Sequence, residues 1–351
     1  MNSDAKTPFS ENFYMPAEWA PHKSVWLAWP SAAHLWLEDL KPAQDEFVAF
    51  AKAIADIDPK TGQARGESLN ILVPDVKAGS EAEQRLAGLP VTIHLIPFGD
   101  IWLRDTAPLF LKNHHGEIAT LQFKFNSWGQ KYNLPYDSDV AQNVAKSLPF
   151  RTFVAPWICE GGSLELDGEG TCLTTRQCLL NENRNPQMNQ EQIENLIHEY
   201  LGTSKVLWLG DGLINDHTDG HIDTIARFVA PGHIAIHKAM TDDDPNRAII
   251  ERIDQDCQKF TDAKGRQLKI TYVPSPGTVL DEDGELMPAS HLNFYIANTT
   301  VIVPTYGTHW DNEAVQAVAS CFPERKTIGL SAKAILTGGG AFHCISQQQP
   351  I

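Results

Sequence analysis

The sequence has few cysteines, and they form no pattern typical of a disulfide framework or a metal site. The six are Cys159, Cys172, Cys178, Cys257, Cys321 and Cys344. No two are separated by two residues, and residues 1–14 lack the basic region and apolar run of a signal peptide, so we interpret all six as reduced thiols of a cytoplasmic protein. Because their spacing matches no common set of zinc ligands, the sequence also predicts no bound metal.

Long apolar runs and an excess of positive charge are also absent from the sequence. No stretch approaches the ~20 consecutive apolar residues of a membrane span, so we expect no membrane partner. The 351 residues include 28 basic and 44 acidic side chains, a formal charge of −16. This balance argues against a nucleic-acid partner, because binding to phosphates needs a basic surface. It suits the capture of a cationic substrate, although solubility alone also accounts for it.

Short strands and helices alternate along the chain. Five β-branched runs end in proline, which cannot continue a central ladder, and each predicts a strand that stops there: 71–74, 153–156, 228–231, 271–274 and 301–304. Helical periodicity predicts helices over 42–57, 190–201, 246–260 and 311–321, the last with Asp311 as its N-cap. No linker divides the chain, so we expect one α/β domain over residues 1–351. The pattern leaves open whether the strands form ββαβ repeats or one doubly wound sheet.

Four segments concentrate polar residues, glycines and tryptophans: 99–108, 159–163, 215–223 and 338–344. His221 and Asp223 are two positions apart, so in a strand both would face the same side. Such a pair is typical of an acid–base couple, half of a metal site or a structural contact. Glu160 and Asp105 add two carboxylates, which in loops are also commonly helix caps or solvated groups.

Cys344 follows three consecutive glycines, which allow the backbone to approach a ligand closely. The thiol is therefore either a small buried hydrophobic group or a nucleophile that pairs with a distant histidine. The other five cysteines lie in apolar or helical stretches, and we interpret them as structural.

Several long motifs follow one another in order along nearly the whole chain. They are Met15-Pro16-Ala17-Glu18-Trp19, Trp26-Leu27-Ala28-Trp29-Pro30, the segment 102–108, Glu160-Gly161-Gly162-Ser163, Thr218-Asp219-Gly220-His221, Asn293-Phe294-Tyr295, and Gly338-Gly339-Gly340 with His343-Cys344. In this order they resemble the agmatine deiminase family of guanidine-modifying enzymes. The chain departs from the family pattern at His217 and Phe342, two changes that we expect to alter the substrate pocket.

The resemblance implies a fold, a reaction and a set of partners. The fold is a pseudo-fivefold α/β propeller of ββαβ-type repeats with a central active site. The reaction is the hydrolysis of agmatine, a small cationic guanidino substrate, to N-carbamoylputrescine and ammonia in putrescine biosynthesis. No metal or organic cofactor is needed, and a homodimer is the family expectation.

The resemblance also assigns roles to eight residues of this sequence. The implied catalytic residues are Cys344 as nucleophile, His221 as general acid and base, Glu160 as its orienting partner, and Asp105 and Asp223 as acceptors of hydrogen bonds from the guanidinium group. The implied substrate-binding residues are Trp102, Trp128 and Gly340, together with the same two aspartates.

Other functions share the same motifs. The chain could act on arginine, peptidyl-arginine or another guanidino compound, transfer the amidino group to an amine, or bind polyamines or guanidines without catalysis. A substrate with an α-carboxylate would need a basic side chain in the pocket, and Arg104 and Arg227 lie near the motifs. Simple binding needs no nucleophile, so the presence of Cys344 favours an enzyme.

Overall fold

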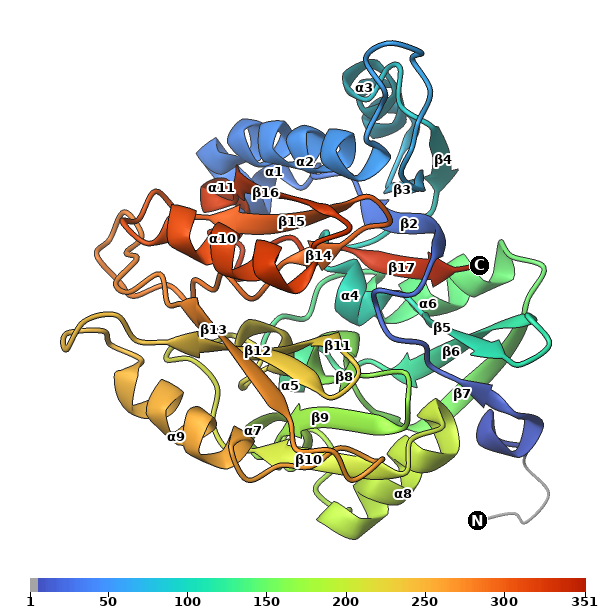
Figure 1. The fold of residues 1–351 in the computed structure, drawn as a ribbon. Coiled ribbons are helices and arrows are strands. Elements are labelled where there is room, and N and C mark those ends of the chain that lie inside the picture. Colours follow the sequence, from blue (N-terminus) through green and yellow to red (C-terminus); the bar gives the residue numbers. More distant parts are fainter. Residues whose placement is uncertain (1–5) are drawn as a thin grey trace.

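The computed structural model describes residues 6–351, whose strands form five separate sheets (Figure 1). The sheets are β1(Phe13–Tyr14)-β5(Leu109–Asn113)-β6(Ile118–Lys124)-β7(Arg151–Ile158), β10(Lys205–Leu209)-β9(Thr171–Thr175)-β8(Glu165–Leu166), β11(Ala226–Ala230)-β12(His233–Lys238)-β13(Lys269–Pro274), β14(Tyr295–Ile296)-β15(Thr300–Thr305)-β16(Lys326–Ser331), and β17(Gln347–Pro350)-β2(His22–Ala28)-β3(Ser68–Val73)-β4(Val91–Leu95). The mixed α/β class predicted from the sequence is confirmed, and the alternative of one doubly wound sheet is wrong.

The helices connect and cover these sheets. They are α1(Ala33–Trp36), α2(Leu40–Ala55), α3(Val76–Arg85), α4(Leu103–Thr106), α5(Ser127–Gln130), α6(Asp137–Lys146), α7(Arg176–Leu179), α8(Gln190–Leu201), α9(Arg247–Cys257), α10(Asp311–Cys321) and α11(Lys333–Leu336), with the 3-10 turns η1(Phe9–Glu11), η2(Leu37–Asp39), η3(Gly161–Ser163) and η4(Ile222–Thr224). Within residues 6–351, no helix is long and apolar enough to cross a membrane.

All five sheets share one order of strands. In each, an antiparallel pair is followed by a strand parallel to its second member: β5/β6 then β7, β8/β9 then β10, β11/β12 then β13, β14/β15 then β16, and β17/β2 then β3. The parallel connections contain helices α6, α8, α9, α10 and α2, respectively. Parallel neighbours need such a crossover, because a tight hairpin can only reverse the chain.

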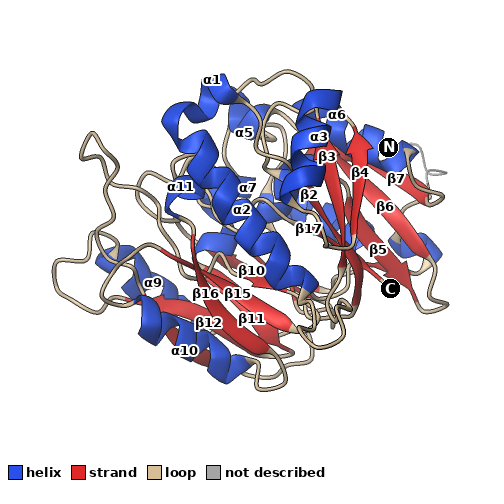
Figure 2. Ribbon diagram, turned by 90° about the horizontal axis from the view of Figure 1, so that it is seen from above, coloured by secondary structure: helices blue, strands red, loops and turns tan. Residues whose placement is uncertain are grey.

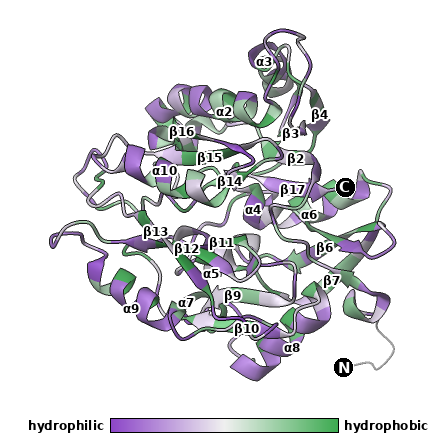
Figure 3. Cartoon of the chain, viewed as in Figure 1, coloured by the Kyte–Doolittle hydropathy of each residue, from purple (hydrophilic) through white to green (hydrophobic). Residues whose placement is uncertain are grey.

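Helices of the parallel connections cover the outer faces of the sheets, whereas α4 and α5 lie between the sheets (Figure 1). Figure 2 shows α9 and α10 at the edge of the molecule, and these helices contact β12 and β16, respectively. Figure 3 shows purple and green segments alternating along α2, α9 and α10, as expected for helices with one hydrophobic face. On α2, this face buries Phe47, Phe50, Ala51 and Ile54 against the strands.

Three of the five prolines end their strands as predicted, and two do not. β3 and β11 stop directly before Pro74 and Pro231, and Pro274 is the last residue of β13. The prediction is wrong at Pro156, because β7 is an edge strand, where a missing N–H group can face away from the ladder. It is also wrong at Pro304, because β14 pairs only with the earlier part of β15 and leaves one side of the proline free.

The helix predictions are mostly confirmed, and α8 has the predicted bounds. Asp311, however, is the first residue of α10 and not its N-cap. Its carboxylate accepts hydrogen bonds from the backbone N–H groups of Tyr306, Gly307 and Thr308 at 3.2, 2.7 and 3.1 Å, so it closes the preceding loop.

A buried ion-pair network ties the N-terminal loop to the sheets. Arg227 on β11 donates from Nε to Glu165 at 2.9 Å and from a terminal nitrogen to Glu18 at 2.7 Å, and all three side chains are buried. Burial alone would raise the pKa of Glu18, but Arg227 and His343 hold it well below its ordinary value. The carboxylates therefore depend on their cations to remain ionised inside the protein.

We predict that Arg227→Met destabilises the fold by about 3–5 kcal/mol, because it leaves two buried carboxylates without their cation. The matched control is Arg247→Met, which removes an exposed arginine from a surface pair and should change stability little. Urea unfolding of both variants measures the difference. Equal unfolding midpoints would show that the buried network contributes no more than a surface pair.

Candidate active site

The Cys344 thiol lies at the bottom of a cavity. Asn293 donates a hydrogen bond from Nδ2 to its Sγ atom at 3.1 Å, and Asp223 Oδ2 lies 3.6 Å from the same sulfur. Asn293 Oδ1 also accepts from the backbone N–H of Cys344 at 3.3 Å. The sequence motif contained Asn293, but nothing in its spacing indicated that it contacts the thiol.

Asp105 and Asp223 converge on Cys344 from two different turns. Asp105 in α4 accepts from the N–H of Gly162 at 2.9 Å and from Nε1 of Trp128 at 2.8 Å. Asp223 lies in the 3-10 turn η4 and His221 is its N-cap, so the two residues do not lie on a strand. Among the described residues, its Oδ1 atom is buried without a hydrogen-bond partner. Both carboxylates thus retain acceptor capacity for a ligand.

Gly162 lies at the point where three side chains meet. A Cβ atom at this position would be 2.6 Å from Nδ1 of His221, 2.9 Å from Oδ1 of Asp105 and 3.2 Å from Oδ2 of Asp223. Only glycine leaves room for this convergence.

His221 lies between two carboxylates without a close hydrogen bond to either. Its Nδ1 is 3.8 Å from Asp105 and its Nε2 is 3.9 Å from Glu160. Although burial favours the neutral ring, the Asp105 carboxylate, Cys178 and Glu160 hold the pKa of His221 well above its ordinary value. The imidazole is therefore protonated in the free protein at neutral pH.

Glu160 is held by a second cation. Arg184 donates from Nε to Glu160 Oε1 at 2.7 Å and from a terminal nitrogen to Asp219 at 2.9 Å. Burial would raise the pKa of Glu160, but His221 and Arg184 lower it. Arg184 lies in a segment that the sequence analysis left without a role.

Aromatic side chains form the walls of the cavity, which has a volume of about 260 Å³. The lining residues are Leu35, Trp36, Asp100, Trp102, Asp105, Trp128, Tyr132, Leu134, His217, Thr218, Thr337, Gly338, Gly339, Gly340 and Cys344. Trp36 and Trp102 stack with ring centroids 6.1 Å apart, and their N–H groups donate to the two oxygens of Asp100 at 2.9 and 2.8 Å. A Cβ atom at Gly340 would be 2.8 Å from the Trp102 ring, so the glycine lets the wall approach the thiol.

Trp128 reaches the cavity from a left-handed turn. Ser127, Trp128, Gly129 and Gln130 all have positive φ, from 52° to 79°. Left-handed backbone costs a non-glycine residue roughly 1–2 kcal/mol, so the surrounding contacts must hold the turn in place. Asn126 contributes by accepting the Gly129 N–H at 3.0 Å.

Two residues at which the chain departs from the family pattern have different positions. His217 lines the cavity and stacks on Tyr132, with ring centroids 5.6 Å apart. Phe342 is fully buried, stacks on Phe50 with ring centroids 4.6 Å apart and does not line the cavity.

The two arginines near the motifs point away from the cavity. Arg104 donates to Gln348 at 2.7 Å and to the His343 carbonyl at 3.3 Å, and Arg227 binds Glu165 and Glu18. None of the residues that line the cavity is a lysine or an arginine. The cavity therefore offers acidic groups, aromatic faces and a thiol, but no side-chain cation of high pKa for an anionic ligand.

Comparisons with known proteins identify the family. The model of the family described as Porphyromonas-type peptidyl-arginine deiminase matches residues 14–350. Agmatine deiminase of Stutzerimonas stutzeri is 36% identical over 375 residues, which cover 100% of this chain and 99% of that protein. This chain belongs to the agmatine deiminase family.

Solved structures of the agmatine deiminase family agree with this assignment. That of the Enterococcus faecalis enzyme superposes with a TM-score of 0.91 at 34% identity, covering 99% of this chain and 98% of that one. A substrate-bound agmatine deiminase of C. jejuni superposes with a TM-score of 0.84 at 26% identity, covering 96% of each chain.

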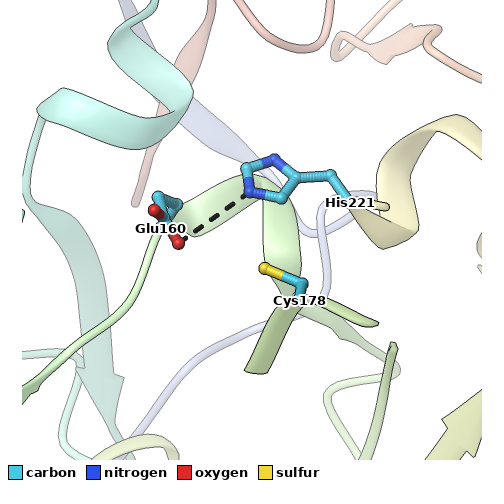
Figure 4. A group of neighbouring side chains, drawn as sticks. All are labelled: Glu160, Cys178 and His221. Atoms are coloured by element: carbon cyan, nitrogen blue, oxygen red, sulfur yellow. Dashed lines mark ion pairs between the residues drawn. The ribbon is translucent and has the colours of Figure 1, made fainter. Parts of the chain in front are cut away.

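One cysteine interpreted as structural lies beside the site. Cys178 in α7 packs next to Glu160 and His221, and one ligand atom from each of the three lies within 4.8 Å of the other two (Figure 4). The spacing argument against a metal site missed this cluster because its members are far apart in sequence. These three residues could hold a metal ion.

The protonation state of Cys344 follows from its surroundings. Burial and the carboxylates of Asp223 and Asp105 raise the pKa of the thiol well above its ordinary value. The free protein at neutral pH therefore holds a thiol, and the thiolate fraction rises with pH. A small cation between the carboxylates should lower this pKa and increase the thiolate fraction.

We predict that neutral iodoacetamide alkylates Cys344 slowly at pH 7 and roughly tenfold faster per pH unit up to pH 9, because the thiolate is the nucleophile. A haloacetamidinium reagent should react faster at pH 7, because its cation pairs with the aspartates. Mass spectrometry of modified peptides measures both rates, with Cys344→Ser as background. A rate that does not change with pH would contradict the raised pKa.

Proposed function

We propose that this protein is an agmatine deiminase that hydrolyses agmatine to N-carbamoylputrescine and ammonia, on a route to putrescine, through a covalent intermediate on Cys344. The observation that carries the proposal is the convergence of a thiol, an imidazole and two carboxylates at one end of an aromatic cavity lined by no lysine or arginine. Similarity to agmatine deiminases over nearly the whole chain supports the same reaction.

We also infer that the five sheets are arranged as a pseudo-fivefold propeller with the site at its axis. The site residues support this arrangement, because five different connections between sheets contribute to the site. The contributions are Asp105 between β4 and β5, Glu160 between β7 and β8, His221 and Asp223 between β10 and β11, Asn293 between β13 and β14, and Cys344 between β16 and β17. Residues from five sheets meet most simply where the sheets share a centre.

The geometry assigns a task to each group in the reaction. The guanidinium group is planar and permanently charged, so it needs charge compensation and orientation before a nucleophile can attack its central carbon. Asp105 and Asp223 would accept its N–H groups in the forked geometry that suits a carboxylate. The Trp102 ring would support the cation, a contact that contributes about 0.5–2 kcal/mol.

The covalent step would follow substrate binding. The bound cation favours loss of the thiol proton to solvent, and the thiolate of Cys344 forms a bond to the guanidinium carbon. His221, already protonated, donates its proton to the departing amino group, and the C–N bond breaks with release of ammonia. Neutral His221 then removes a proton from water, whose oxygen attacks the same carbon. The C–S bond breaks to give the ureido product, and the proton of the new hydroxyl group returns to the Cys344 sulfur.

The nucleophile can be tested directly. We predict that Cys344→Ser keeps the fold and abolishes ammonia release, and that His221→Ala accumulates a covalent adduct on Cys344. Mass spectrometry after a short incubation with agmatine locates the adduct. Attachment to any other cysteine would contradict the scheme, and release of ammonia only when an acceptor amine is present would favour amidinotransfer.

We predict that Gly162→Ala lowers kcat by at least ~100-fold, because a Cβ atom would displace His221, Asp105 and Asp223 from their shared position. Gly210→Ala is the control, since a Cβ atom there meets nothing within 4 Å. Circular dichroism checks that both variants fold. Full activity of Gly162→Ala would show that the three groups need not converge.

Agmatine should exceed free arginine by at least ~100-fold in kcat/KM, because burying the arginine carboxylate without a cation costs several kcal/mol and ~1.4 kcal/mol is a factor of ten. Arg104 and Arg227 cannot supply that cation, since both are engaged away from the cavity. Ammonia release from agmatine, arginine and an arginyl peptide, measured side by side, tests the difference. Comparable kcat/KM values for arginine and agmatine would indicate that a basic side chain binds the arginine carboxylate.

A further inference from the structure

We propose that Glu160, Cys178 and His221 form a binding site for Zn²⁺ or a similar thiophilic divalent cation, and that the bound ion blocks the reaction. The three side chains come from separate segments and point toward one another (Figure 4). Nε2 of His221 lies 3.9 Å from Oε2 of Glu160, and the Cys178 sulfur lies within 4.8 Å of both residues' ligand atoms.

Unpartnered atoms provide an independent reason to expect a ligand here. Oε2 of Glu160 and Nε2 of His221 are buried and have no hydrogen-bond partner among the described residues. The side chains are 0% and 1% exposed, respectively. A buried polar atom without a partner costs roughly 1–3 kcal/mol, and a cation between these two atoms would engage both.

The donor set selects the kind of ion. A carboxylate, a thiolate and an imidazole are the ligands that zinc uses in proteins, whereas Mg²⁺ and Ca²⁺ prefer oxygen ligands alone. With bonds of about 2.0–2.3 Å in a tetrahedron, zinc ligands lie about 3.6 Å apart. The cluster would have to contract by at most about 1.2 Å, the difference between 3.6 Å and the 4.8 Å within which its ligand atoms lie.

The local charge also fits a divalent ion. The Cys178 thiolate and the Glu160 carboxylate would neutralise its two positive charges. Arg184 donates a hydrogen bond from Nε to Oε1 of Glu160 at 2.7 Å and is also paired with Asp219. Arg184 therefore need not move when the other oxygen, Oε2, binds the ion.

Inhibition rests on the proposed role of His221. A histidine whose Nε2 atom is coordinated cannot donate a proton to ammonia or take one from water at that atom. The same ion would withdraw Glu160 from its position beside the ring. The site would therefore act as an inhibitory metal site and not as a cofactor site.

The test uses Co²⁺ as a spectroscopic probe on protein first dialysed against a chelator. Wild type should bind one equivalent and show the charge-transfer absorption of a cobalt–thiolate bond. Cys344→Ser, which lacks the proposed nucleophile, and Cys172→Ser, which alters a buried thiol on β9, should keep this band. Cys178→Ala should lose it and bind Zn²⁺ at least ~100-fold more weakly by calorimetry, because a direct ligand is missing.

Several outcomes would overturn the proposal. They are an unchanged band in Cys178→Ala, a band that disappears only in Cys344→Ser, or no binding by wild type at millimolar metal. Cys178→Ser, which preserves the side-chain volume, replaces the alanine variant if that variant fails to fold. These readouts need no substrate, so they remain valid if the protein proves inactive on agmatine.

A final arm tests inhibition. Zn²⁺ should suppress ammonia release by wild type and leave Cys178→Ala active. Equal sensitivity of the two proteins would refute the inhibitory role even if Co²⁺ binds at Cys178.

Discussion

The position of Cys344 depends on one buried carboxylate, that of Glu18. It accepts hydrogen bonds from Arg227 and from Nε2 of His343, at 2.7 and 2.8 Å, and the other nitrogen of His343 meets Asp223 at 2.7 Å. His343 therefore links Glu18, in a loop near the N-terminus, to Asp223, and the residue that follows His343 is Cys344.

This network also explains how an acidic cavity can exist in a protein with arginines so close by. Arg104 and Arg227 compensate carboxylates beneath the site, where both are fully buried. Their charges pair with carboxylates of the scaffold and not with those of the cavity, whose walls include Asp100 and Asp105. The arginines neutralise buried carboxylates of the scaffold, and the cavity wall keeps its own carboxylates. This distribution suits a ligand that carries cations and no carboxylate.

Local patterns predicted much of the fold and part of the site. Helix α8 has a capping box at Asn189 and glycine at its C-cap. The hydrophobic period and the capping residues indicate the same ends of the helix, so its predicted bounds were correct. The prediction that the strand ends at Pro304 was wrong, because a strand can include proline where no neighbouring strand needs its N–H group. The sequence alone does not show how far the neighbouring strand extends. The motifs contained the site residues, but the contacts of Asn293 and Cys178 arise only when connections from different sheets meet. The single domain over residues 1–351 and the homodimer remain predictions.

Strand β17 has a consequence for how the chain folds during synthesis. Gln347 of β17 pairs with Trp26 of β2, roughly 320 residues earlier in the chain. At about 5–20 residues per second, a ribosome needs on the order of 16–64 s to make the intervening segment. Through that interval the largely apolar β2 has no antiparallel neighbour on one edge, the condition under which strands associate wrongly. This sheet can therefore be completed only after β17 has left the ribosome.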